Sequence, residues 1–265
     1  SFQEPDMIAL RSFAPVLFAS GLIAGLVPFS ATAQTGDISP QDRAGIEKII
    51  REYLIQNPEV LQEALVELER RQQQAQEDAQ KQALASYSEA LTQSPHGIVV
   101  GNPDGDVTLV EFFDYNCGYC KRAVADVAAL TKADPKLRVV LRDLPILGPD
   151  SVDASVVALA AREQLDGDKY FEFHTRLMTS RGRVGKERAL AVAKEMGLDL
   201  ARLQKDLESP KVREALAETL ELGDKLSLTG TPAFVIGDAI IPGAVGAEPI
   251  RQRIASMRSC GKSEC

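Results

Sequence analysis

The sequence has little of several residue types, and each shortage excludes a class of protein. It contains no tryptophan, four cysteines and two histidines in 265 residues. Four cysteines are too few for a scaffold held together by many disulfides. Basic residues are outnumbered, with 30 Lys and Arg against 38 Asp and Glu, a formal charge of −8. Because no long basic cluster is present either, nothing suggests a nucleic-acid partner.

Residues 1–33 have the features of a secretory leader. Arg11 gives a basic start, residues 13–29 form a short apolar core, and Ala31-Thr32-Ala33 offers a small-residue exit. Together they predict a signal peptide that is cleaved after Ala33. A membrane anchor is the alternative, but a core with glycine and proline falls short of the roughly 20 apolar residues of a spanning helix. We therefore expect export to the periplasm, where a CxxC can persist as a disulfide.

Residues 34–93 are predicted to be a helical oligomerisation segment with a polar linker. Ser39-Pro40 resembles an N-cap followed by proline at the first helical position. Apolar residues recur at helical spacing through residues 40–68, whereas residues 69–82 are polar on all sides. Because the apolar face has no evident partner in the chain, we expect a homo-oligomer formed through residues 40–68. The alternative is a helix packed back on its own domain.

Residues 94–265 show the element order of an α/β domain. A strand-helix-strand pattern precedes a helical block at about 149–228, and two short strands and a helix follow that block. This order predicts a thioredoxin fold with an inserted helical domain. The expected elements are the strands 98–100, 107–113, 137–142, 233–236 and 239–241, and the helices 121–131 and 247–258.

The chemistry is predicted at Cys117-Gly118-Tyr119-Cys120, between a buried strand and a helix. At such a junction the first thiol lies over free backbone N–H groups and the positive end of the helix dipole. This environment favours the thiolate, which is the nucleophile in disulfide exchange. A zinc knuckle uses the same spacing but needs a second pair of ligands, and Cys260 and Cys265 are separated by four residues rather than two. A purely structural bridge would stabilise little, since its loop is very short.

Three further positions favour redox chemistry. Glu111 has apolar neighbours and is expected to be buried beneath the disulfide, where a raised pKa would suit it to exchange a proton with Cys120. Thr231-Pro232 precedes a strand and could bring the Thr231 backbone beside the CxxC, where it would hydrogen-bond an extended substrate chain. Most X-Pro bonds are trans, so the residues alone do not indicate a cis bond here. Tyr119 is expected to be exposed and to contact unfolded polypeptide.

The run from Val110 to Lys121, with Thr231-Pro232 far downstream and a helical insertion between them, resembles the DsbA-like family of exported thiol–disulfide oxidoreductases. The resemblance covers about residues 40–258. Three segments look like the ScsC (suppressor of copper sensitivity) branch of this family, namely Ile49 to Leu54, Asn57 to Leu61, and Asp143 to Gly148.

The resemblance implies a role for each site residue. It implies Cys117 as the attacking, solvent-facing thiol, Cys120 as the resolving thiol, Glu111 as the buried acid and Thr231-Pro232 as a cis-proline loop. It requires no cofactor. The implied partners are unfolded or misoxidised exported proteins and a membrane redox protein.

The dipeptide between the cysteines departs from the strongly oxidising members of the family. Those members carry Pro-His there, whereas this chain has Gly118-Tyr119, the dipeptide of the dimeric isomerase DsbC. A thiolate without a neighbouring histidine predicts a weaker oxidant. Known ScsC-like proteins oligomerise through their N-terminal helices, some as trimers with isomerase activity. We therefore expect an isomerase or reductase; the alternatives are a dithiol oxidase, a Cu(I)-binding thiol protein and an interaction protein with an idle disulfide.

The remaining cysteines and histidines are expected to be structural. Cys260 and Cys265 could close a small C-terminal disulfide in an oxidising compartment, with a second redox pair or a soft-metal site as alternatives. His174 lies beside two phenylalanines and is expected to pack in the core, and His96 is expected in a linker.

Overall fold

The computed structural model describes residues 39–265, so the predicted leader at residues 1–33 lies outside the described part of the chain. The chain divides into two compact units, one ending at Gln62 and the other running from Glu63 to Cys265. Within residues 39–265, no helix combines the length and the apolar character that a membrane span needs.

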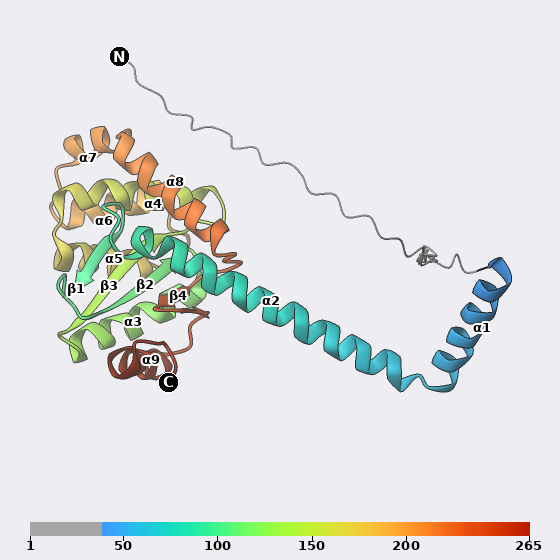
Figure 1. Cartoon of the computed structure of the whole chain (residues 1–265). Helices are drawn as coiled ribbons and strands as arrows, with labels where there is room; N and C mark the ends of the chain where they lie inside the picture. Colours follow the sequence, from blue (N-terminus) through green and yellow to red (C-terminus); the bar gives the residue numbers. More distant parts are fainter. Residues whose placement is uncertain (1–38) are drawn as a thin grey trace, which may run out of the picture. The chain divides into compact units, whose positions relative to one another are not determined.

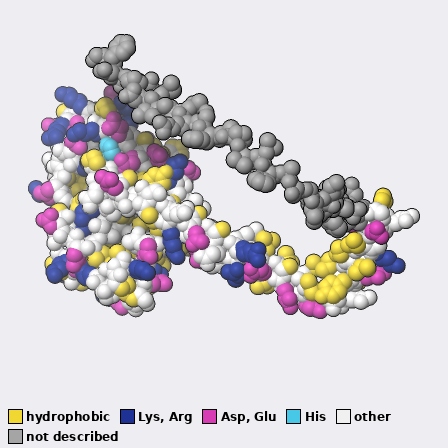
Figure 2. All heavy atoms as spheres, viewed as in Figure 1, with side chains coloured by type: hydrophobic (Ala, Val, Ile, Leu, Met, Phe, Trp, Pro, Cys, Tyr) yellow, Lys and Arg dark blue, Asp and Glu magenta, His cyan; other side chains and the backbone are white. Residues whose placement is uncertain are grey.

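Helix α1 (Pro40–Gln56) of the first unit begins at the predicted cap. The Ser39 hydroxyl accepts a hydrogen bond from the Asp42 backbone N–H at 3.2 Å, which satisfies one free donor of the first turn. At the other end, Asn57 donates to the Tyr53 carbonyl from both its side chain and its backbone. Hydrophobic side chains gather on the surface of this first unit (Figure 2). The exposed ones in this unit are Ile46, Ile49, Ile50, Tyr53, Ile55 and Leu61.

The second unit contains a five-stranded sheet in the order β1-β3-β2-β4-β5. Figure 1 labels β1 to β4 of this sheet. Strands β2 and β3 are parallel, and the other neighbouring pairs are antiparallel. The parallel pair is joined through helix α3 (Gly118–Ala133), as the predicted thioredoxin fold requires. The strands are β1 (Ile98–Gly101), β2 (Val107–Phe113), β3 (Leu137–Asp143), β4 (Ala233–Ile236) and β5 (Ala239–Pro242).

The predicted helical insertion lies between β3 and β4. It consists of five α-helices and one 3-10 helix. Several of these helices have proline or aspartate at or next to their N-terminal residue. The helices of the insertion are α4 (Pro149–Ala161), η1 (Arg162–Gln164), α5 (Gly167–Met178), α6 (Lys186–Glu195), α7 (Leu200–Asp206) and α8 (Pro210–Lys225). Besides α1, the helices outside the insertion are α2 (Glu59–Thr92), α3 (Gly118–Ala133) and α9 (Ala247–Cys260).

Helices cover both faces of the sheet, which explains why β2 is apolar almost throughout. Side chains alternate along a strand. Leu109 and Phe113 therefore share one face, where they belong to the larger core with α3, α9 and the insertion. Val110 and Phe112 share the other face and pack in a smaller core with α2 and α8. By the same alternation, Glu111 lies on the face that α3 covers.

The C-terminal part of α2 belongs to the second unit. Leu84 and Leu91 are buried there, 3% and 2% exposed, and pack against β2, β3 and α8. The sequence pattern placed all of residues 34–93 in the N-terminal segment and its linker. The structure instead makes the last turns of α2 part of the domain core, because these turns carry apolar residues again after the polar stretch.

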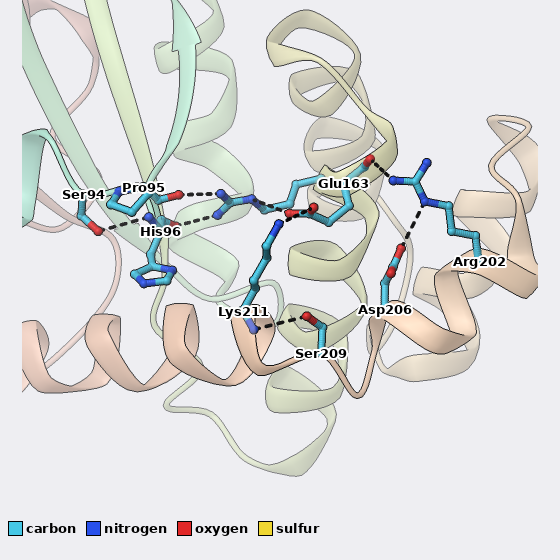
Figure 3. Close-up of polar contacts among 9 residues, drawn as sticks. Ser94, Pro95, His96, Glu163, Arg202, Asp206, Ser209 and Lys211 are labelled. Carbon is cyan, nitrogen blue, oxygen red and sulfur yellow. Dashed lines mark hydrogen bonds and ion pairs between the residues drawn. The ribbon is translucent and has the colours of Figure 1, made fainter.

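The segment after α2 is fastened to the insertion by polar contacts (Figure 3). Arg162 of η1 donates to the carbonyl oxygens of Pro95 and His96, at 2.5 and 2.9 Å. Glu163 Oε2 lies 3.2 Å from Lys211 Nζ on α8. A hollow of about 220 Å³ lies beside these residues. The two cations that line this hollow, Arg162 and Lys211, already have partners. The hollow therefore marks a packing contact between segments and is not an anion-binding site.

Candidate active site

The two central cysteines lie at the start of α3, as predicted. Cys117 is the N-cap residue, with φ −78° and ψ 118°, and its side chain caps no backbone group. The N–H groups of the first turn are therefore free to face a negative charge at this end of the helix. Cys120 is fully buried one turn later, and both cysteines are free thiols in this structure. Burial raises the pKa of the Cys120 thiol well above its usual range.

A loop from the far end of the domain closes over Cys117. The peptide bond between Thr231 and Pro232 is cis, as the family resemblance implied. The Cys117 thiol donates a hydrogen bond to the Thr231 carbonyl at 3.1 Å, although the two residues are 114 positions apart. This contact leaves Cys117 only 6% exposed, so the sulfur is less open than the expected solvent-facing thiol.

Glu111 is a buried acid on the α3 face of β2, as the sequence predicted. It is 1% exposed, and its Oε2 has no hydrogen-bond partner within the described residues. Burial, and secondarily the charge of Asp126, raises the pKa of Glu111 to about 8. A carboxyl group with this pKa can both hold and release a proton near neutral pH.

A groove of about 710 Å³ runs beside the Thr231-Pro232 loop. The groove is lined by apolar side chains, hydroxyl groups and the backbone of loop residues, and no charged side chain lines it. Tyr119 forms part of its wall and is 60% exposed, and the Arg122 guanidinium lies 4.3 Å from the centre of the Tyr119 ring. Such a surface suits an extended, uncharged stretch of polypeptide. Other lining residues include Gln80, Leu228, Thr229, Gly230, Ile240, Pro242 and Val245.

The turn before Cys117 contains a buried aspartate that the sequence reasoning missed. Asp114 is fully buried. Its Oδ1 accepts hydrogen bonds from the Asn116 N–H and the Ser151 hydroxyl, both at 2.7 Å, and its Oδ2 accepts one from the Leu147 N–H at 3.0 Å. The available signal was the polar pair Asp114 and Asn116 inside an otherwise apolar run that leads to the cysteines.

The other two cysteines lie at the C-terminus, and His174 lies against Tyr115, with its Nδ1 3.3 Å from the Tyr115 hydroxyl. Cys260 and Cys265 form the expected disulfide. His174 packs edge-on against Phe113 with ring centres 4.6 Å apart, and burial lowers the pKa of His174 to about 3. It is therefore a neutral core residue. Within residues 39–265, no three side chains of His, Cys, Asp or Glu gather so as to hold a metal ion.

Two families match this chain. The DsbA-like thioredoxin domain matches residues 108–255, and the N-terminal domain of the copper resistance protein ScsC matches residues 42–75. Among curated relatives, a Na(+)/H(+) antiporter of Salinispora arenicola is 29% identical over 158 residues, 60% of this chain. The chain spans about a quarter of that antiporter's length, 24%. A probable disulfide bond formation protein D of Bacillus anthracis is 25% identical over 52% of this chain and 68% of its own length.

Solved structures agree with the family match. A thioredoxin-like oxidoreductase from Silicibacter pomeroyi is 45% identical and has a TM-score of 0.62, over 65% of this chain and 98% of its own. ScsC of Proteus mirabilis in a transitional conformation is 31% identical with a TM-score of 0.59, over 80% of this chain and 94% of its own. The chain therefore belongs to the DsbA-like thioredoxin family, and its N-terminal helices match the ScsC N-terminal domain.

Proposed function

We propose that this chain is an exported, periplasmic thiol–disulfide oxidoreductase that acts on protein disulfides through Cys117 and Cys120. One observation carries the proposal. Cys117 lies at the N-terminus of α3 with the Thr231 carbonyl 3.1 Å from its sulfur, and Cys120 is buried one turn later. A thiol held there can exchange its bond with a disulfide presented along the adjoining groove.

The reaction begins when the Cys117 thiolate attacks a client disulfide. A mixed disulfide forms between Cys117 and one client sulfur, and the other client sulfur leaves as a thiolate. Cys120 then loses its proton and attacks the Cys117 sulfur, which forms the Cys117–Cys120 disulfide and releases the reduced client. Alternatively, another client thiolate attacks the mixed disulfide, which leaves Cys117 reduced and the client with a new pairing. The second route is isomerisation.

We assign Glu111 as the group that accepts the proton from the Cys120 thiol. It lies on the sheet face that α3 covers, and its own pKa of about 8 lets it take up the proton that Cys120 must lose. The Thr231-Pro232 loop and Tyr119 are assigned to client binding, since both line the groove. The backbone of the loop would pair with an extended client chain, and the Tyr119 ring would contact its apolar side chains.

Replacing Glu111 by glutamine is expected to flatten the pH dependence of stability. The folded protein holds a proton on Glu111 up to about pH 8, whereas an unfolded chain releases it above its usual value of 4.5. The folded state then binds more protons than the unfolded state, so stability falls as pH rises through this window, by up to about 1.4 kcal/mol per pH unit. Urea titrations at pH 5, 6, 7 and 8 would measure the slope in both proteins. Parallel slopes would contradict a buried, protonated Glu111.

We further infer that the protein is a homo-oligomer and an isomerase rather than a dedicated oxidase. The apolar residues of α1 and of the first turns of α2 are exposed in the single chain, where Ile49 and Ile55 are each 67% exposed. Such a stripe would be buried by association of helices from several copies. Several active sites facing one client act at high effective concentration, which favours repeated reshuffling. An isomerase must stay reduced, so a membrane reductant partner is implied.

Removing residues 34–75 is expected to convert the oligomer into a monomer and to abolish most isomerase activity. The cut leaves Leu84 and Leu91 in place, because these residues belong to the domain core. Light scattering would give the mass of both proteins, and refolding of a scrambled client by each reduced protein would give the activity. The oxidised proteins would be compared on a reduced client in parallel.

The outcomes separate the competing functions. Loss of isomerase activity with retained oxidation of the reduced client supports the proposal. Fast oxidation by both proteins without any refolding of the scrambled client would identify a dithiol oxidase. If neither protein exchanges disulfides with a client, the proposed chemistry itself is wrong.

A further inference from the structure

The residue immediately before Cys117 is held by the helical insertion. The Asn116 side-chain amide donates to the Val184 carbonyl at 2.9 Å and to the Ser151 hydroxyl at 3.0 Å. Its side-chain oxygen accepts a hydrogen bond from the Val184 N–H at 2.8 Å. The asparagine thus pairs with both backbone groups of Val184, much as a neighbouring strand would. Val184 lies between α5 and α6, and Ser151 lies in the first turn of α4.

A second link joins the same loop to α3 just after Cys120. The Lys121 ammonium group donates to the carbonyls of Ser180 and Gly182, at 3.1 and 3.3 Å. The loop is itself braced, because the Arg188 guanidinium donates to the Ser180 hydroxyl at 3.0 Å. The loop at residues 180–184 therefore contacts both ends of the CxxC motif. It binds Asn116, just before the motif, and Lys121, just after it.

We propose that Asn116 is a positioning residue for the thiol chemistry, through which the helical insertion sets the direction of the Cys117 sulfur relative to the first turn of α3. This inference rests on the proposed function, and it gives the insertion a part in the reaction besides its packing. Asn116 touches no reacting atom. It acts through the backbone that joins it to Cys117.

The physical reason is the short range of N–H stabilisation. A thiolate at an N-cap gains from the free N–H groups only while they point at the sulfur, and the effect fades within the first turn. Cys117 has no side-chain cap of its own to fix this turn. Three hydrogen bonds of Asn116 hold the preceding residue instead. Without them, the N-terminal residues of α3 are free to fray, and the thiolate loses part of its stabilisation.

Replacing Asn116 by alanine is expected to slow alkylation of Cys117 by iodoacetamide about three- to tenfold at pH 6. The loss of rate should be largest at low pH and should shrink as the pH rises, which a purely structural effect would not produce. The measurement uses the full chain with Cys120→Ala, so that Cys117 is the one free thiol while Cys260 and Cys265 stay joined.

Asn102 supplies the matched control. Its side chain donates to the Pro135 carbonyl at 2.8 Å and accepts from the Asp104 N–H at 2.9 Å, in the turn between β1 and β2. Asn102→Ala therefore removes asparagine hydrogen bonds of the same kind without touching the loop at residues 180–184. Thermal unfolding of both variants would compare their stability.

The inference is supported if Asn116→Ala slows alkylation and Asn102→Ala does not. It is overturned if Asn116→Ala reacts as fast as the parent at every pH, or if both variants slow equally. Should Asn116→Ala fail to fold, Ser151→Ala removes one partner of the amide and should slow alkylation to a smaller degree; no slowing there also overturns the inference. A parent protein whose Cys117 reacts no faster than an ordinary thiol would contradict the proposed function itself, whatever Asn116 does.

Discussion

Replacing Cys120 by serine is expected to leave the protein covalently attached to its clients. Cys117 can still attack a client disulfide, but the buried thiol that would resolve the mixed disulfide is gone. Replacing Cys117 by serine should instead lower exchange at least about 10³-fold, since a hydroxyl without an activating base is a poor nucleophile. Incubation with a scrambled client, acid quenching and a non-reducing gel would show the adducts.

The two single variants and the double variant form one matched set. Adducts should accumulate with Cys120→Ser, and they should be absent with Cys117→Ser and with both changes together. Adducts that form through Cys120 in the Cys117→Ser protein would reverse the assigned roles. The burial of Cys120 argues against that outcome, because its raised pKa leaves little thiolate near neutral pH.

Replacing Arg142 by leucine is expected to destabilise the domain by about 3–5 kcal/mol, the range for breaking a buried ion pair from one side. The Arg142 side chain on β3 is fully buried and donates to Glu218 on α8 at 2.7 Å. It also donates to the Ala90 and Leu91 carbonyls at the end of α2. Burial lowers the pKa of Arg142, and Glu218 opposes this shift. Without Arg142, the two helices on this sheet face lose their shared polar partner.

Urea unfolding would measure this loss, and Arg176→Ala is the control. Arg176 pairs with Glu172 at 2.6 Å on the surface of α5, where both side chains are about half exposed, 45% and 53%. An exposed pair of this kind contributes at most about 1 kcal/mol. Equal and small effects of Arg142→Leu and Arg176→Ala would show that the end of α2 is held by its apolar contacts alone.

Much of the local structure could be read from the sequence. The strand at residues 107–113 was placed correctly because it is apolar on both faces, as a central strand covered by helices must be. The start of α1 followed from Ser39, and the hairpin of β4 and β5 followed from Gly237-Asp238. These signals are short-range, since caps, turns and alternation depend on residues that are neighbours in the chain.

The candidate site was predicted in part. The two cysteines and Glu111 lie near one another in the sequence, so a motif and an apolar run were enough to indicate them. Thr231 lies 114 residues from Cys117, and its contact with the sulfur was expected only from the family resemblance. The hydrogen bonds between Asn116 and the insertion were not predicted, because no sequence motif marks Ser151 or Val184 as partners.

The sequence by itself determined the order of the elements, the identity of the two thiols and the burial of Glu111, since each follows from residue type and local spacing. Only the tertiary structure decided how open the Cys117 sulfur is, which turns of α2 belong to the core, and which distant groups hold the CxxC turn. These features depend on groups that lie far apart in the chain, from 35 positions for Asn116 and Ser151 to 114 positions for Cys117 and Thr231. Their hydrogen bonds form only when the sheet and its helices have packed. Sequence periodicity, which reflects neighbouring residues, therefore does not predict them.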